Sequence, residues 1–221
     1  MNKKFSLKLS ISFISIIALL VAAFILKTVI LKPRPINKIE FDKVYTCGLY
    51  GDYPKNDESR YYITLKKDKT FVLIEDESRG KEEDYLEDGD YNYPNIDISF
   101  GKYEIKDGNY VLTTTQGARV KFKNTAGVKK KMINFYWQGA LIGDDANEKM
   151  VIFITPESQF VSGYPNKNSK TYNKHRRFCT LYNKSDIKKL PDSPDEFRKQ
   201  FKMDKKAEKE RVEREKNFGI S

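Results

Sequence analysis

The chain is poor in the residues that most often bind transition metals. Among its 221 residues there are one histidine and two cysteines. Neither Cys47 nor Cys179 has a second cysteine or a histidine nearby at the spacing of a zinc site, so we expect no zinc and no cofactor. The two cysteines could close a disulfide across the domain or stay as two buried thiols on strands. Their spacing leaves both alternatives open.

The single histidine is also a poor candidate for catalysis. His175 lies in a run of cations, between Lys174 and the pair Arg176 and Arg177. No carboxylate lies close to it in sequence that could orient the imidazole as a general base. We therefore identify no catalytic residue. An exported hydrolase that combines His175 with the carboxylates of the acidic segment 75–97 is the alternative hypothesis.

The acidic segment from Glu75 to Asp97 contains an incomplete calcium motif. Asp88, Asp90 and Asn92 place oxygen side chains at alternating positions, as a calcium-binding loop does. The next position is not glycine and the twelfth position of the loop is not glutamate, so the pattern fails. The segment reads as a solvated loop that holds no metal and no buried carboxyl group.

One long apolar run stands out at the N-terminus. Eighteen residues without a charge, Leu9–Leu26, follow a basic leader that spans residues 1–8. Extended to residue 31, a helix here reaches the hydrocarbon thickness of about 30 Å. We expect an uncleaved transmembrane helix over residues 9–31. The small residues at positions 21–23 make a cleaved secretory signal the alternative.

The orientation of this segment is not decided by charge, because basic residues flank it on both sides. A short basic leader before an apolar run is typical of export signals. We therefore expect a single-pass protein of a bacterial cell membrane with the bulk of its chain extracytoplasmic. A cytoplasm-facing anchored interaction domain is the alternative.

The rest of the chain divides into three parts by composition. Two prolines in residues 32–42 predict an extended linker. Residues 43–184 contain about nine short alternating runs, rich in β-branched and aromatic residues, with no helix that could serve as a crossover. This predicts a mainly β domain, an antiparallel meander that closes into an eight- or nine-stranded barrel or a strongly curled sheet. Residues 185–221 form a tail with a charged helix.

Several turns and one alternating strand can be placed. We expect hairpin turns at Lys67–Lys69 and Asp107–Gly108 and a further turn at Gln116–Gly117. Alternation in Arg119–Lys123 sends its two apolar residues into the barrel and its three cations to water. The residues expected in the barrel interior are Phe71, Leu73, Tyr103, Leu112, Val120, Phe122 and Phe135.

The tail carries a helix start signal. Ser193 is the expected N-cap, Pro194 the first helical residue and Glu196 the partner of a capping box. Phe197 and Phe201 lie four residues apart and can dock on the barrel together. Beyond them, lysine–glutamate and arginine–glutamate pairs predict a solvated helix.

A family resemblance rests on the first strands. The patterns Gly48-x-Tyr50, Tyr62-x-Thr64-x-x-x-Asp68-x-Thr70-Phe71 and Gly101-x-Tyr103-x-Ile105-x-x-Gly108 occur within residues 44–123. Over this range the chain resembles small bacterial lipocalin-like β-barrel domains. The resemblance implies a barrel that holds a small apolar ligand or offers a passive interaction surface, and it implies no catalytic residue.

The charge of the domain is mildly basic. Five of the 41 lysines and arginines lie within residues 1–32, which leaves 36 basic residues against 31 acidic ones. Such a balance suits lipid headgroups or anionic wall polymers and does not require nucleic acid. The candidate contacts for an anionic surface are Lys129, Lys130, Lys131, Lys174, Arg176 and Arg177. We expect a membrane-anchored binding or interaction module, with a wall polymer, a small apolar ligand or an envelope protein as its partner.

Overall fold

The computed structural model divides into two units, residues 1–34 and residues 35–221. It describes residues 16–22, 24, 32–49, 51–85, 93–140, 149–164 and 176–217. In the first unit, residues 16–22 are helical and their side chains are exposed. Within the described ranges, no helix combines the length and the apolar character that crossing a bilayer requires.

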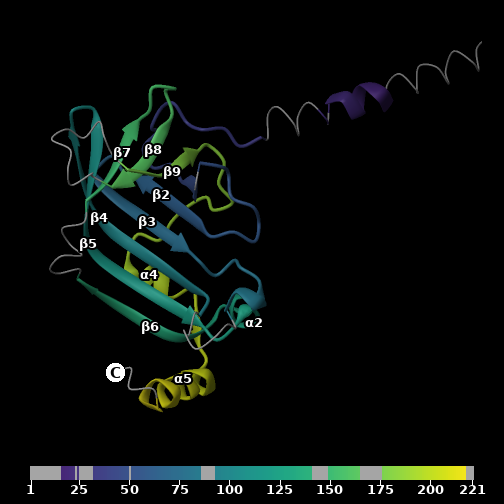
Figure 1. Cartoon of the computed structure of the whole chain (residues 1–221), viewed down its shortest axis with the longest axis vertical. Coiled ribbons are helices and arrows are strands. Elements are labelled where there is room, and N and C mark those ends of the chain that lie inside the picture. The colour runs from purple at the N-terminus through teal and green to yellow at the C-terminus, as the bar shows by residue number, and fades with distance from the viewer. Residues whose placement is uncertain are drawn as a thin grey trace, which may run out of the picture. The chain divides into compact units, whose positions relative to one another are not determined.

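Eight antiparallel strands close into a barrel in the second unit (Figure 1), as the sequence predicts. The strands are Tyr45–Leu49 (β1), Arg60–Leu65 (β2), Thr70–Asp76 (β3), Asn95–Lys106 (β4), Asn109–Phe122 (β5), Met150–Ile154 (β7), Phe160–Tyr164 (β8) and Arg176–Tyr182 (β9). Around the barrel they follow the order β1-β2-β3-β4-β5-β7-β8-β9, and β9 pairs with β1. Closure satisfies the backbone groups that an open sheet would leave at its edges.

The remaining elements lie outside this ring. They are Glu82–Tyr85 (η2, a 3-10 helix), Thr125–Lys130 (α2), Met132–Ala140 (β6), Pro194–Arg198 (α4), Lys202–Met203 (β10) and Lys205–Asn217 (α5). Strand β6 extends the sheet beyond β5, and β10 pairs with β6 in parallel. Helix α2 was not predicted. Its N-cap is Asn124, whose side-chain oxygen accepts a hydrogen bond from the Gly127 amide at 2.9 Å.

Strand β5 is long because it serves two neighbours. Its segment Tyr110–Leu112 pairs with β7, and its segment Gln116–Phe122 pairs with β6. The turn predicted at Gln116–Gly117 is therefore wrong, since both residues are paired with β4 on one side and with β6 on the other. Because β6 and β7 take different parts of β5, they diverge, and the inner face of the sheet is left open beside β6.

The two predicted hairpins are confirmed. Asp107 and Gly108 have φ values of 50° and 78°, the left-handed pair that a two-residue hairpin turn needs. Lys69, with φ 65°, ends the β2–β3 turn. At the β4–β5 bulge a Cβ atom on Gly101 would lie 2.1 Å from the carbonyl oxygen of Thr113. Only glycine permits this close approach of the two backbones.

Side chains from β2 and β3 are buried on both faces of the sheet, so the domain has two apolar clusters. The inner cluster fills the barrel and includes Tyr45, Cys47, Tyr61, Ile63, Leu65, Phe71, Leu73, Tyr103, Leu112, Ile152, Cys179 and Leu181. The outer cluster includes Tyr62, Val72, Ile74, Ile98, Val120, Phe122, Ile133, Leu190, Phe197 and Phe201. The outer face of the sheet is therefore covered by the C-terminal segment and is not exposed to solvent.

The outer cluster shows that the predicted orientation of the β5 side chains is wrong. Val120 and Phe122 alternate as predicted, but they point to the outer face and not into the barrel. Phe122 packs edge to face against Phe201, with 5.7 Å between ring centroids. The cations Arg119 and Lys121 consequently point to the inner face. Period-two alternation identifies two faces but does not say which of them a distant segment will cover.

The C-terminal segment docks as predicted. Ser193 caps α4 by accepting a hydrogen bond from the Glu196 amide at 3.1 Å. The Glu196 carboxylate reaches back to the Asp192 amide at 2.7 Å, one residue before the expected partner. Phe197 and Phe201 pack edge to face with a centroid distance of 5.2 Å on the outer cluster.

Helix α5 is less solvated than predicted. Arg211 is 8% exposed and donates from Nε to the carbonyl oxygen of Asn134 at 3.1 Å. Glu210 forms an ion pair with Lys123, the residue after β5, instead of a pair within the helix. The expected pair between Lys209 and Glu213 does form, at 3.9 Å. Contacts with β6 thus hold a helix whose own composition is polar.

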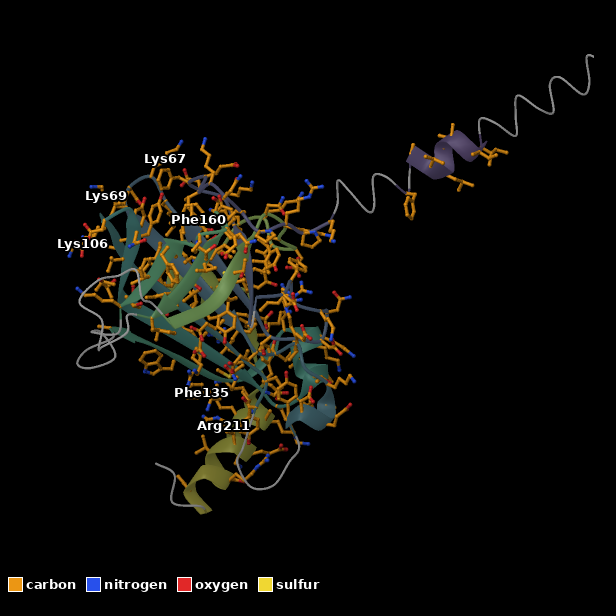
Figure 2. All side chains as sticks on the ribbon, turned by 45° about the horizontal axis from the view of Figure 1, so that its top comes forward. Lys67, Lys69, Lys106, Phe135, Phe160 and Arg211 are labelled. Atoms are coloured by element: carbon orange, nitrogen blue, oxygen red, sulfur yellow. The ribbon has the colours of Figure 1, made fainter. Side chains whose placement is uncertain are left out.

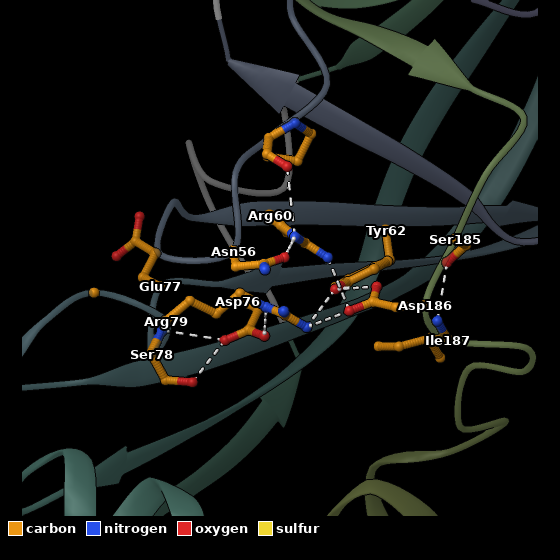
Figure 3. A network of polar contacts seen from close by, with 12 residues as sticks. Asn56, Arg60, Tyr62, Asp76, Glu77, Ser78, Arg79, Ser185, Asp186 and Ile187 are labelled. Atoms are coloured by element: carbon orange, nitrogen blue, oxygen red, sulfur yellow. Dashed lines mark hydrogen bonds and ion pairs between the residues drawn. The ribbon is translucent and has the colours of Figure 1, made fainter. Parts of the chain in front are cut away.

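A polar network fixes the start of the C-terminal segment to the outer face (Figure 3). Arg60 is 4% exposed and donates from Nη1 to Asp186 Oδ2 at 2.9 Å. Tyr62 donates to Asp186 Oδ1 at 2.8 Å, and Arg79 donates to Asp186 Oδ2 at 3.0 Å. Burial acts against ionisation, but the Tyr62 hydrogen bond and the charges of Arg79 and Arg60 hold the pKa of Asp186 below its usual value.

The segment expected as a linker, residues 32–42, is partly built into the domain. Pro35 forms a β-bridge with Tyr182, and the Ile36 amide donates to the Leu181 carbonyl at 3.0 Å. The Ile36 and Ile39 side chains are buried in the inner cluster. The globular unit therefore begins at Pro35.

Candidate functional site

A groove of about 400 Å³ lies on the inner face of β3, β4, β5 and β6, beside the point where β6 leaves the barrel. Its lining residues are Glu75, Asp97, Ile98, Ser99, Gly117, Ala118, Arg119, Lys121, Phe135 and Trp137. Charged and aromatic side chains share this surface, which distinguishes it from the apolar barrel interior. Concave sites with a few converging polar groups are the usual places for ligands.

Sheet register builds the wall of the groove. Glu75 lies opposite Asp97, Asp97 opposite Arg119, and Arg119 opposite Trp137. On β2, Tyr61 lies opposite Glu75 and continues the row into the barrel. Directly opposite residues project to the same face with Cβ atoms about 5 Å apart. Five strands thus place five functional side chains in one line.

A second row forms the floor. Ser99 lies opposite Gly117, and Gly117 lies opposite Gly139. These residues have small side chains or none, so the groove is open above the backbone at these positions. A Cβ atom on Gly139 would lie 2.9 Å from the Trp137 ring, which shows that the indole packs directly on the glycine.

The charges of the groove are unequally satisfied. Arg119 donates from Nε to Asp97 in an ion pair. Among the described residues, none forms a hydrogen bond or an ion pair with the Glu75 carboxylate. Burial, with the nearby charges of Asp97 and Glu77, raises the pKa of Glu75 to about 7, and the positive charge of Arg119 only partly offsets this. Glu75 is therefore the group in the groove that titrates near neutral pH.

Two aromatic rings border the groove at β6. Lys121 Nζ lies 5.3 Å from the centroid of Phe135, and Arg211 Cζ lies 4.9 Å from the same centroid. Figure 2 shows Phe135 and Arg211 next to each other where α5 meets the sheet. Trp137, by contrast, is 42% exposed. It is the only tryptophan of the chain, so its fluorescence reports on this site alone.

Glu75 gives the fold a distinct pH dependence. A carboxyl group whose folded pKa is raised from 4.5 to about 7 binds more protons in the folded state, so stability falls as the pH rises from about 4.5 to about 7. At pH 8, Glu75→Gln should be more stable than the wild type by about 1–3 kcal/mol. At pH 4.5 the two proteins should be equally stable. Chemical denaturation at both pH values checks this.

An equal difference at both pH values would contradict the assignment of the titration to Glu75. Glu104→Gln serves as the matched control, because Glu104 lies on β4 outside the groove and pairs with Lys106. This control should follow the wild-type pH dependence.

The predicted anionic-surface residues separate into two groups. Lys129, Lys130 and Lys131 are exposed at the end of α2, and Lys129 and Lys131 line a second pocket of about 410 Å³ with Arg79. Asp76 lines that pocket as well.

The structure describes only part of the second group, which is Lys174, Arg176 and Arg177. Lys174 and His175 lie outside the described residues. For Arg176 and Arg177 only the backbone, in β9, is described. The hydrolase that would use His175 therefore stays an alternative hypothesis.

The two cysteines lie on paired strands inside the barrel. Cys47 on β1 and Cys179 on β9 are both buried free thiols. A hydrogen bond with Cys179 and burial raise the pKa of the Cys47 thiol. Cys179 Sγ also lies 2.9 Å from Ser162 Oγ. A raised pKa disfavours reactivity of the Cys47 thiol. A disulfide between the two cysteines stays one of the two alternatives.

The acidic segment contains the signal that sequence reasoning missed. Its first and last residues, Glu75 and Asp97, are strand residues that face each other in the groove. The alternation that buries Leu73 continues to Glu75, and this period-two relation could have identified it. Positions 88–92 of the incomplete calcium motif lie outside the described residues. Among the residues that are described, no cluster of three or more metal-ligating side chains occurs.

Of the seven residues expected in the barrel interior, four lie there. Phe71, Leu73, Tyr103 and Leu112 pack within the inner cluster. Val120 and Phe122 belong to the outer cluster, and Phe135 borders the groove. A lipocalin-like apolar cavity is therefore not what these residues form.

Comparison with known proteins adds no family: no family model, curated protein or solved structure matches the chain. The barrel itself is the part of the lipocalin-like resemblance that holds.

Proposed function

We propose that the chain is a membrane-anchored extracytoplasmic binding module whose ligand site is the groove between Glu75 and Trp137. One observation carries the proposal: an open groove of about 400 Å³ in which charged and aromatic side chains from four strands converge. Rigid strands position these side chains, which is the arrangement that specific binding requires. No reaction is proposed.

The anchor in this proposal comes from the N-terminal sequence. Residues 9–31 are apolar enough to span a bilayer, and the basic leader before them favours an N-terminus inside and a domain outside. The domain starts at Pro35, four residues after this segment. Envelope proteins and wall polymers are the partners that an anchored extracytoplasmic domain would meet.

The groove favours a polar ligand over the small apolar one that the lipocalin-like resemblance implies. Four of its ten lining residues, Glu75, Asp97, Arg119 and Lys121, carry charges. Bringing a purely apolar molecule against them would remove water from charged groups without replacing their hydrogen bonds. A ligand with hydrogen-bonding or charged groups avoids that cost.

Photo-crosslinking in cells that naturally make the chain tests the proposal. A photoreactive phenylalanine analogue replaces Ser99 on the groove floor in the full-length chain. We expect the chain in the membrane fraction and, after irradiation, an adduct detected by a mass shift. The matched control carries the same analogue at Ile105, which is exposed on β4 outside the groove.

An adduct at Ser99 but not at Ile105 supports a ligand in the groove. Equal adducts at both positions, or none at Ser99, would overturn the groove as the binding site. Recovery of the chain in the soluble fraction, without its first thirty or so residues, would overturn the anchor.

A further inference from the structure

The groove has an unmatched negative charge. Its two cations already have partners, because Arg119 pairs with Asp97 and Lys121 lies over the Phe135 ring. The Glu75 carboxylate has no hydrogen-bond or ion-pair partner within the described part of the chain. The carboxylate charge of Glu75 therefore remains for a ligand to neutralise.

The groups around Glu75 add to the negative charge at this end of the groove. Tyr61 faces it from β2, Asp97 faces it from β4, Glu77 follows it on β3, and Arg119 on β5 is the cation that acts on it. Two of these four groups are carboxylates and one is neutral at physiological pH. A positively charged ligand group beside Glu75 would meet a net negative local potential.

The other end of the groove provides an aromatic surface. Trp137 packs on Gly139, and 42% of its surface is exposed. Asp97 and Arg119 lie between Glu75 and Trp137 in the same row. The neighbouring row, Ser99 and Gly117, leaves room for a flat or narrow ligand body. Two strands separate the two ends, which corresponds to roughly 14 Å at about 4.8 Å per strand spacing.

We propose that the groove binds an organic cation in which a primary ammonium group is joined by a short chain to a ring, with the ammonium at Glu75 and the ring against Trp137. This deepens the proposed function and rests on the groove as its site. Small amines and lysine side chains next to an aromatic group share this chemistry. An ammonium of this kind both pairs with the carboxylate and can lie over an aromatic face.

Binding of such a cation should depend on pH. The ionised form of Glu75 is the one that attracts it, and the pKa of this group is about 7. The ionised fraction then falls from about nine-tenths at pH 8 to about one-tenth at pH 6, so affinity should weaken about tenfold. A lysine-type ammonium keeps its charge at both pH values. The change in affinity therefore reports on the protein.

Titration of the full chain in detergent micelles tests the proposal, with Trp137 fluorescence as the readout. The probe is Nα-benzoyl-lysinamide, and the matched ligand is its Nε-acetylated form, which lacks the charge. We expect saturable binding of the probe at pH 8, about tenfold weaker binding at pH 6, and at least tenfold weaker binding of the acetylated form. Micelles without protein give the blank.

Two variants assign the charge. Glu75→Gln should lower the affinity for the probe at least tenfold and remove the pH dependence, whereas Glu104→Gln should bind as the wild type does. Equal binding of the acetylated probe, equal affinity at pH 6 and pH 8, or no saturable binding at pH 8 would overturn the inference. The comparisons of the two probes and of the two pH values use the wild-type chain, so they hold even if a variant fails to fold. A groove adduct in cells without amine binding would leave the proposed function standing.

Discussion

Replacing Phe197 with alanine should lower the free energy of unfolding by about 3–5 kcal/mol, the largest effect that we expect of a single substitution in this protein. Phe197 is 2% exposed and packs on the outer cluster with Phe201. Truncation removes buried apolar surface and leaves a cavity where a C-terminal helix meets the sheet. Denaturation of the full chain in detergent, followed by Trp137 fluorescence, measures the change.

The control is Val212→Ala on α5, because Val212 is 37% exposed. Exposed substitutions of this kind usually change stability by no more than about 0.5 kcal/mol. If Phe197→Ala were as mild as this control, the C-terminal segment would not be part of the cooperative fold. The outer face of the barrel would then have to be covered in another way.

Replacing Asp186 with alanine should cost about 2–3 kcal/mol. The substitution leaves the guanidinium of Arg60, which is 4% exposed, without its ionic partner (Figure 3). Breaking one side of a buried ion pair is expensive because the remaining charge stays desolvated. Asp186 itself is 42% exposed, which places the expected cost below that of a fully buried pair.

The pH dependence of this effect has a defined sign. The pKa of Asp186 is held below its usual value in the folded state, so its contribution is present at neutral pH and is lost as the pH falls through that lowered value. Denaturation of wild type and Asp186→Ala at pH 7 and in acid should show the difference shrinking in acid.

Asp192→Ala provides the matched comparison. Asp192 also joins the C-terminal segment to β2 and its turn, through Lys66, but its side chain is 48% exposed. An exposed ion pair of this type contributes about 0–1 kcal/mol. Equal losses for Asp186→Ala and Asp192→Ala would show that burial of the Arg60 network does not decide its strength.

Local features of the fold were predictable because they depend on neighbouring residues. The turn at Asp107–Gly108 follows from a glycine that permits positive φ, and Ser193 caps α4 because its side chain reaches an amide three residues away. Phe197 and Phe201 were assigned to one docking face by their four-residue spacing. None of these features requires knowledge of the rest of the chain.

The groove was not predictable in the same way. Alternation placed Val120 and Phe122 on one buried face and Arg119 and Lys121 on the other, but the assignment of the inner and outer face of the barrel was reversed. An acidic segment that reads as a solvated loop contributes Glu75 as a half-buried strand residue. Its raised pKa depends on burial by the folded chain and on the charge of Asp97, which comes from a different strand.

The sequence by itself determined the β character of the domain, the alternation of its strands, the two tight hairpins and the capped helix start of the tail. The tertiary structure alone decided which face of each strand is inside, how β5 is shared between β6 and β7, and which charges meet in the groove. The physical reason is that a period of two is symmetric between faces. Only the segments that cover a face, and these come from far along the chain, break that symmetry.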